Sequence, residues 1–225
     1  MKFLKRGIAV LLCLLLCGCG AQPNVTEPST LPQPTLSAPQ KYDAAKQATL
    51  QAQNLILEYT LLRTRYVGED TYLESVTGTA SFSHLGQEDM VAVVEERLDY
   101  GSYSASYNQV YCEGVAYAEL KDSVFSTQQT PQVFIQRQIP AVLISSENYG
   151  SVTEEIEADT TRIFFSQGTA LEAWLKAPEG AQIVSSSGTA VLHSSGDLLQ
   201  TTYLAEYTCG DVRYTCEASV RVTRP

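Results

Sequence analysis

The feature that most constrains the fold is an alternation of apolar and polar residues near the end of the chain. From Val212 to Val222 every second residue is apolar or tyrosine, while Arg, Thr, Glu and Ser fill the positions between. Side chains of a β-strand point alternately to its two faces, so this pattern predicts a strand with one buried and one solvated face. Such strands are typical of antiparallel sheets, which can leave one face in water.

The same alternation recurs along much of the chain and predicts a long antiparallel meander. The segments that carry it are residues 59–64, 71–83, 90–98, 103–117, 183–193 and 198–209. Turn residues separate them at Gly68-Glu69-Asp70, 85–89, Ser195-Gly196-Asp197 and Gly210-Asp211, and Asn108 and Glu113-Gly114 are candidate turns or bulges. Residues 152–165 are interpreted as one further strand.

Three segments are patterned as helices instead. Residues 41–57 carry apolar side chains at helical spacing, which predicts an amphipathic helix that begins near Tyr42, with Pro39 outside it and no strong cap. Residues 133–144, broken at Pro140, and residues 169–175, which contain Trp174, predict two short helices.

This element order predicts an α+β domain. The sheet should be mostly antiparallel, with the N-terminal helix and the short interior helices packed against it. The alternative is a β-sandwich, in which the two interior helices are an awkward fit.

The start of the chain has the layout of an export signal. Lys2, Lys5 and Arg6 precede an uncharged apolar run that is too short to span a bilayer comfortably. The run ends at Leu16-Cys17-Gly18-Cys19, which resembles the lipobox of bacterial lipoproteins. The resemblance implies cleavage before Cys19 and acylation of that cysteine with palmitate and diacylglycerol chains. The alternative is an ordinary signal peptide or an uncleaved anchor.

These features predict three regions: a signal peptide at residues 1–18, a lipidated Cys19 with a tether at residues 19–40, and one domain at residues 41–225. The tether is rich in proline and should be a disordered spacer. The predicted location is the extracytoplasmic face of a cell membrane, held by the lipid anchor.

The charge of the chain excludes one class of partner. The formal net charge is −10. The charged residues of the predicted signal peptide are all basic, so its cleavage makes the net charge more negative. Lysine and arginine that could neutralise phosphates are scarce and scattered, so we expect no nucleic acid partner.

The order of elements behind a lipobox resembles the LolA/LppX-like lipid-carrier lipoproteins. In that family a strongly curved, unclosed antiparallel sheet wraps around helices, and the groove between them can take acyl chains. For this chain the resemblance implies a curved, mostly antiparallel sheet, an unclosed half-barrel, packed on the N-terminal helix and the short interior helices. The resemblance implies a non-catalytic protein that binds an apolar or amphipathic, lipid-like ligand. The alternative is a surface module that contacts another envelope protein through an exposed sheet face.

Aromatic residues are the candidates for lining such a groove or surface. Tyr103, Tyr107 and Tyr111 are predicted to share a strand face, and Trp174 lies in a short helix. Tyrosine is also a good strand former with one polar end, so an ordinary sheet face explains the three tyrosines equally.

The search for catalytic, metal and cofactor motifs leads us to expect none of these and no enzyme activity. His193-Ser194-Ser195-Gly196-Asp197 contains triad residue types, but triad members converge from separate segments, so this stretch is interpreted as a turn. Glu154, Glu155, Glu157 and Asp159 lack a calcium-loop pattern and are interpreted as a solvated strand face.

A two-residue turn at Gly210-Asp211 also predicts the register of the last hairpin. Cys209 would lie opposite Val212, and Cys216 opposite Ala205. The two sulfurs would then be too far apart along the strands for a disulfide. Pairing of Cys112 with either cysteine stays open.

Overall fold

The computed structural model describes residues 35–120, 123–138, 144–175 and 177–225. The predicted signal peptide, Cys19 and most of the predicted tether lie outside these residues. The folded unit runs from Leu36 to Pro225. Within the described part of the chain, no helix is long and apolar enough to cross a membrane.

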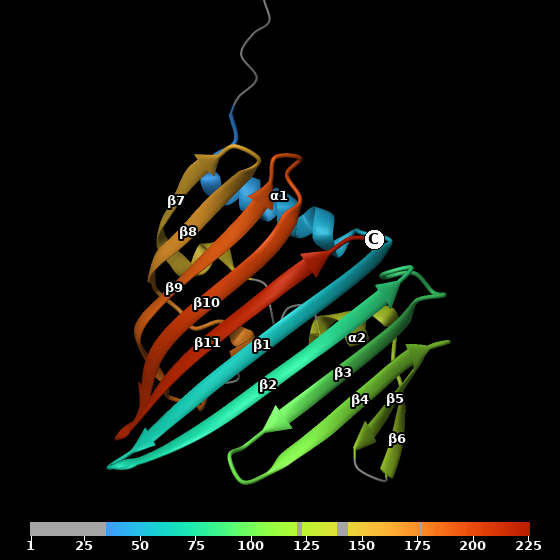
Figure 1. Ribbon diagram of the computed structural model, residues 1–225, viewed down its shortest axis with the longest axis horizontal. Helices are drawn as coiled ribbons and strands as arrows, with labels where there is room; N and C mark the ends of the chain where they lie inside the picture. Colours follow the sequence, from blue (N-terminus) through green and yellow to red (C-terminus); the bar gives the residue numbers. More distant parts are fainter. Residues whose placement is uncertain (1–34, 121–122, 139–143, 176) are drawn as a thin grey trace, which may run out of the picture. The chain divides into compact units, whose positions relative to one another are not determined.

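The described strands form one antiparallel sheet with the order β6-β5-β4-β3-β2-β1-β11-β10-β9-β8-β7. Their bounds are β1 Asn54–Val67, β2 Asp70–Ser83, β3 Val91–Asp99, β4 Ser104–Cys112, β5 Val115–Leu120, β6 Ser123–Gln128, β7 Tyr149–Glu157, β8 Thr160–Gly168, β9 Gln182–His193, β10 Leu198–Cys209 and β11 Val212–Thr223. The first and last strands, β1 and β11, are neighbours at the centre of the sheet. The edge strands β6 and β7 do not pair with each other, so the sheet is curved but not closed (Figure 1).

Both α-helices lie on the concave face of this sheet, behind the strands in Figure 1. Helix α1 (Ala38–Leu50) packs on β7, β8, β9 and β10, and helix α2 (Pro131–Gln138) lies over the other half. Two short 3-10 helices, η2 (Ser146–Asn148) and η3 (Ala173–Leu175), complete the described elements. The predicted half-barrel on helices is confirmed, and the β-sandwich alternative is wrong because all the strands that the structure describes belong to one sheet.

The core lies between the concave face and the two helices. Under α1, Tyr42 packs edge-on against Phe165 of β8 with ring centroids 4.9 Å apart. Under α2, Phe134 packs against Tyr111 of β4 at 5.0 Å. The strand residue of each pair, Phe165 or Tyr111, lies at an inward position of the alternating pattern. The alternation in the sequence therefore corresponds to one buried face of the sheet.

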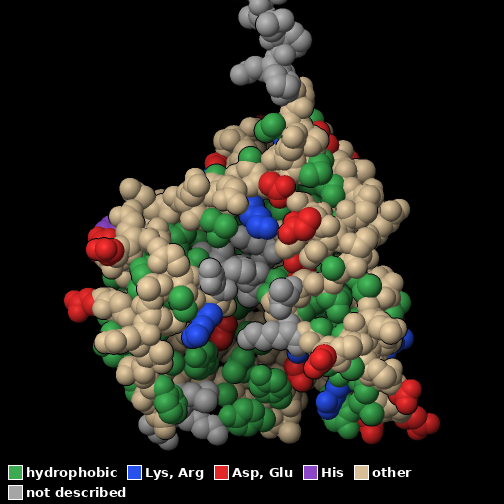
Figure 2. Space-filling model, turned by 180° about the vertical axis from the view of Figure 1, so that it is seen from behind, with side chains coloured by type: hydrophobic (Ala, Val, Ile, Leu, Met, Phe, Trp, Pro, Cys, Tyr) green, Lys and Arg blue, Asp and Glu red, His purple; other side chains and the backbone are tan. Residues whose placement is uncertain are grey.

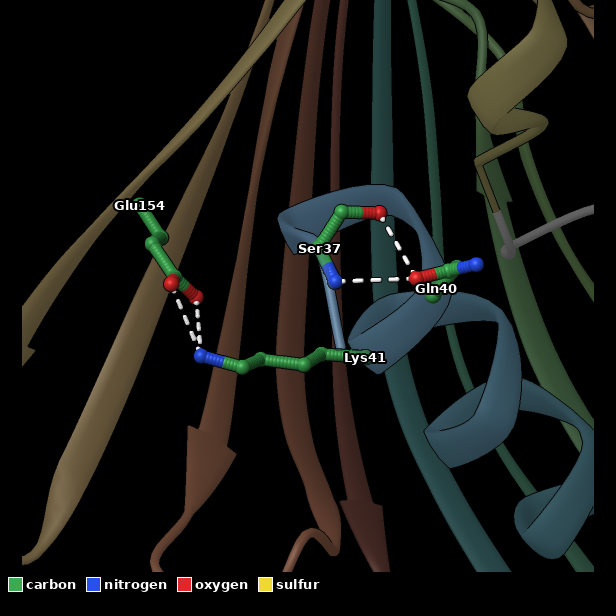
Figure 3. Close-up of polar contacts among 4 residues, drawn as sticks. All are labelled: Ser37, Gln40, Lys41 and Glu154. Carbon is green, nitrogen blue, oxygen red and sulfur yellow. Dashed lines mark hydrogen bonds and ion pairs between the residues drawn. The ribbon is translucent and has the colours of Figure 1, made fainter. Parts of the chain in front are cut away.

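Helix α1 begins earlier and ends earlier than the sequence pattern predicts. Its N-cap is Ser37, whose backbone N–H and hydroxyl both donate to Gln40 Oε1 (Figure 3). Pro39 lies in the first turn of the helix. This is a stronger start than expected, because a proline in the first turn loses no helical hydrogen bond. The helix ends at Leu50, so Leu55 and Ile56 belong to β1 instead, and the domain includes the last residues of the predicted tether.

The prediction of one strand over residues 152–165 is wrong. The segment is the hairpin β7–β8, in which Glu157 lies opposite Thr160. The turn residue Ala158 has a φ of +28°, and the turn contains no glycine, asparagine or proline. The acidic residues therefore lie on different faces: Glu154 points inward, where both its carboxylate oxygens accept from Lys41 Nζ at 2.7 Å (Figure 3).

Smaller differences concern the interior helices. Helix α2 starts at Pro131, and Pro140, where we expected a break, lies outside the described residues. The second interior helix is only the 3-10 turn η3. Asn108 lies within β4 and is not a turn, whereas Glu113-Gly114 does connect β4 to β5.

The predicted register of the last hairpin is confirmed. Cys209 lies opposite Val212, and Ala205 lies opposite Cys216. Cys112, Cys209 and Cys216 are all free thiols in the structure.

Candidate functional site

Four apolar side chains from neighbouring strands line up across the concave face. The register places Leu61 of β1 opposite Val76 of β2, Val76 opposite Leu98 of β3, and Leu98 opposite Ala105 of β4. All four are only half-buried, unlike the residues under α1 and α2. We call these four residues the apolar row. Figure 2 shows this side of the molecule, where hydrophobic side chains gather around a recess.

One side of the apolar row is polar and tightly packed. The Tyr59 hydroxyl donates to Glu96 Oε1 at 2.5 Å, and the tyrosine ring passes over Gly78 between them. Burial, with the adjacent Glu96 carboxylate, raises the pKa of Tyr59 well above its ordinary value. Tyr107 of β4 lies opposite Glu96 and is half-buried. This side therefore offers phenol and carboxylate groups already engaged with each other.

Two arginines from β1 lie on the other side of the apolar row. Arg63 lies opposite Glu74, and Arg65 lies opposite Tyr72. The Arg63 side chain donates through Nη2 to the Leu175 carbonyl of η3, while Glu74 Oε2 is a distant 3.8 Å from Arg63 Nη1. The Arg65 guanidinium lies 4.6 Å from the centre of the Tyr72 ring. Arginine is seldom buried unless it is paired, so this pair is a candidate for binding a ligand.

Several buried donors at this end have no hydrogen-bond partner among the described residues. They are Arg63 Nε, Arg65 Nε, Trp174 Nε1 and Tyr207 Oη. We call these four residues the arginine end. Leaving a buried donor unsatisfied costs roughly 1–3 kcal/mol. The arginine end is therefore rich in donors and short of acceptors.

The four residues of the arginine end belong to one neighbourhood. Tyr207 stacks on Tyr214 with centroids 4.8 Å apart, and Tyr214 lies opposite Arg65. Burial raises the pKa of Tyr207, and the positive charge of Arg63 partly opposes this rise. Trp174 precedes Leu175, the residue that Arg63 contacts.

The predicted aromatic residues lie in different environments. Tyr107 lies on the concave face beside the apolar row. Trp174 packs edge-on against Tyr203, with ring centroids 5.2 Å apart. Tyr111 is fully buried under α2 and donates to the Gln129 carbonyl. Tyr103 is exposed before β4, where its carbonyl accepts from the Tyr100 N–H at 2.7 Å. The shared strand face predicted for the three tyrosines holds for Tyr107 and Tyr111, whereas Tyr103 precedes the strand.

Sequence reasoning missed Arg63 and Arg65 as site residues. Both occupy inward positions of the alternation that begins with Leu55 and Leu57. A basic residue at an inward position of a central strand was the available signal.

A buried carboxyl lies under helix α1. Glu172 is 3% exposed, and its Oε1 accepts from the Ser145 backbone N–H at 2.9 Å. Burial raises the pKa of Glu172 above its ordinary value, although hydrogen bonds and the Lys46 charge oppose the rise. The group thus titrates at a higher pH than an exposed glutamate.

The stretch from His193 to Asp197 forms the turn between β9 and β10, as predicted. The Ser195 hydroxyl lies between the other two groups, 2.8 Å from His193 Nδ1 and 2.7 Å from Asp197 Oδ2. In a hydrolytic triad the imidazole lies between serine and carboxylate. Here the serine lies between the imidazole and the carboxylate, so the three groups are not arranged as a triad. Their contacts instead link residues of one turn. No group of three or more His, Cys, Asp or Glu placed to hold a metal occurs among the residues that the structure describes.

The convex face carries a second feature, an open groove of about 710 Å³ over β1, β2, β3, β4 and β11. Its outward side chains include Thr60, Thr77, Thr79, Ser106, Asn108 and Ser219. Beside it, Val93, Val110 and Tyr117 form an exposed row across β3, β4 and β5.

The comparisons with known proteins concern the fold. No protein-family model and no curated protein matches the chain. Among solved structures, LprF from Mycobacterium bovis is similar with a TM-score of 0.44 and 10% identity over 83% of this chain and 91% of LprF. A LolA superfamily protein from Nitrosomonas europaea has a TM-score of 0.28 and 9% identity over 83% of this chain and 94% of its own.

Proposed function

We propose that this protein is a membrane-anchored, extracytoplasmic lipoprotein that binds an apolar or amphipathic, lipid-like ligand on its concave face. The observation that carries the proposal is the apolar row, which leaves apolar area half-exposed on the concave face. Exposed apolar area in a concave, partly polar site is the usual property of a small-molecule site. The ligand would lie along the row, with its tail on Leu61, Val76, Leu98 and Ala105.

The anchor rests on the residues before the folded unit. Acylation at Cys19 would attach the chain to the membrane, and the proline-rich residues after it would hold the domain above the surface. We expect Cys19→Ala to abolish acylation and recovery in the detergent phase. A wild-type protein that stays in the aqueous phase and carries no lipid mass would contradict the anchor.

Native mass spectrometry tests the ligand. The full chain purified from its own host should carry a lipid-sized mass that organic solvent removes. Leu61→Asn should reduce the lipid-bound fraction several-fold, because it places an amide in the apolar row. The matched control is Leu62→Asn, since Leu62 is the next residue on β1 and lies exposed on the convex face. Equal lipid content in both variants would overturn the assignment to the concave face.

A second candidate function is docking of an envelope protein on the convex face. The exposed row of Val93, Val110 and Tyr117 favours it, because adjacent apolar residues on a solvated sheet face are typical of contact surfaces. Crosslinking in intact cells should then depend on Val110 and not on Leu61.

A further inference from the structure

The arginine end is the feature that the apolar row does not explain. An apolar tail is satisfied by the row itself and needs no hydrogen bonds. The unpaired groups nearby are Arg63 Nε, Arg65 Nε, Trp174 Nε1 and Tyr207 Oη, and all four can donate a hydrogen bond. We infer, on the basis of the proposed function, that this end binds the anionic head group, a phosphate or carboxylate, of the amphipathic ligand.

The shape of the donors fits such a group. A guanidinium presents its N–H groups as a planar fork that matches the oxygens of a phosphate or carboxylate. Arg63 and Arg65 are separated by one residue on β1, so both point to the concave face from the same strand. The Arg63 fork is already oriented by the Leu175 carbonyl, and the Arg65 fork by the Tyr72 ring. Preorganised donors lose little conformational entropy when they bind.

The charge of the protein makes this placement selective. The chain has a formal net charge of −10, so an anion is repelled by most of the surface. A favourable site for an anion therefore needs local positive charge that is shielded from water. Arg63 and Arg65 provide it next to the buried Tyr207, where a charge-assisted hydrogen bond is strengthened by the low dielectric.

Glu74 acts as an internal competitor for the head group. Its carboxylate is opposite Arg63 but stays 3.8 Å from Nη1, which is beyond hydrogen-bond distance. It is also more than a third exposed, so it can swing away when a ligand oxygen approaches. Glu74→Gln keeps the size of the side chain and removes the competing charge. This variant should bind an anionic ligand more tightly than the wild-type protein does.

Three probes separate the head from the tail: monododecyl phosphate, 1-dodecanol and inorganic phosphate. Calorimetry on the full chain, freed of lipid, gives each affinity, and fluorescence of Trp174, the single tryptophan, reports on the arginine end. We expect dodecyl phosphate to bind at least about tenfold more tightly than dodecanol. Inorganic phosphate should bind far more weakly than either, because it gains nothing from the apolar row.

Variants assign the preference to residues. Arg65→Gln should lower the preference for dodecyl phosphate over dodecanol toward one, and Arg65→Lys should retain part of it. The matched control is Arg213→Gln, because Arg213 lies on the convex face at a similar 4.7 Å from the centre of the Tyr66 ring. If Arg65→Gln does not fold, Glu74→Gln still tests the inference through its gain in affinity.

The outcomes are distinguishable. Equal binding of dodecyl phosphate and dodecanol, with no effect of Glu74→Gln, would overturn the head-group site and leave the lipid-binding proposal standing. Binding of inorganic phosphate as tight as that of dodecyl phosphate would overturn it in favour of a free-anion site. No binding of either dodecyl compound would overturn both proposals.

Discussion

The Tyr59 hydroxyl donates to the Glu96 carboxylate at 2.5 Å. Gly78 lies on the strand between the two residues, and because it has no side chain the tyrosine ring can pass over it. A Cβ at residue 78 would lie 2.8 Å from the Tyr59 ring and 2.8 Å from the Glu95 carbonyl. The glycine is therefore a packing requirement at the centre of the concave face. It keeps the polar side of the site closed by a hydrogen bond between β1 and β3.

We expect Gly78→Ala to destabilise the protein by about 1–3 kcal/mol, because the added methyl group has no space. Urea unfolding followed by circular dichroism measures the change. Thr77→Ala, at the neighbouring exposed position of β2, is the control and should change stability by less than about 0.5 kcal/mol. Equal effects of the two substitutions would show that the close approach at residue 78 is not a constraint.

The contact between Lys41 and Glu154 ties α1 to the edge strand β7. Each side chain is less than a third exposed, so water screens the pair only partly. A double-mutant cycle with Lys41→Met and Glu154→Gln should give a coupling energy of about 1 kcal/mol, which falls at high salt.

The pair Arg162–Glu157 on the same hairpin is the control for this cycle. Its atoms are 3.5 Å apart and both side chains are half-exposed. Its coupling should be close to zero. If both pairs couple equally, burial of the Lys41 contact contributes nothing.

Glu172 predicts a pH dependence of stability. Its pKa is raised by burial, so its contribution to folding is fully present when it is protonated and is lost as the pH rises through the raised pKa. Glu172→Gln keeps an oxygen that accepts from Ser145 and carries no charge. As the pH rises from below the ordinary pKa of glutamate to above the raised pKa, the unfolding free energy of the wild-type protein should fall relative to that of the variant. Parallel curves would contradict a raised pKa.

The three described cysteines should differ in reactivity. Burial raises the pKa of the Cys216 thiol to about 12, and the side chain is fully covered. Cys112 and Cys209 are partly exposed. Alkylation of the native protein, mapped by mass spectrometry, should label Cys112 and Cys209 well before Cys216, because the thiolate is the reactive form. A peptide that links Cys209 to Cys216 would contradict the observed register.

Local pattern was enough to predict much of the sheet. The alternation from Val212 to Val222 and the Gly210-Asp211 turn gave both the strand and its register, because a two-residue turn leaves one way to pair the flanking residues. The unclosed half-barrel was expected only from the resemblance in element order. The alternation by itself requires no more than cover on one face of the sheet, which the helical segments supply.

The predicted boundaries were wrong where turn residues mark them only weakly. The turn at Ala158-Asp159 uses an alanine in the left-handed region, and only the pairing of Glu157 with Thr160 makes it visible. Leu55 and Ile56 fit a helical stripe and a strand equally, and pairing with β2 and β11 decides between them.

The candidate site depended on tertiary structure. The sequence by itself determined which residues of β1 share a face, so Leu61, Arg63 and Arg65 follow from the period of a strand. It did not determine that Trp174 and Tyr207, more than a hundred residues later, lie at the same end of that face. For Tyr207 that proximity arises because β1 pairs with β11 and places the last hairpin beside the first strand. Trp174 joins it by packing on Tyr203 of β10. Non-local pairing of this kind leaves no trace in local periodicity, so only the folded sheet could bring the donors together.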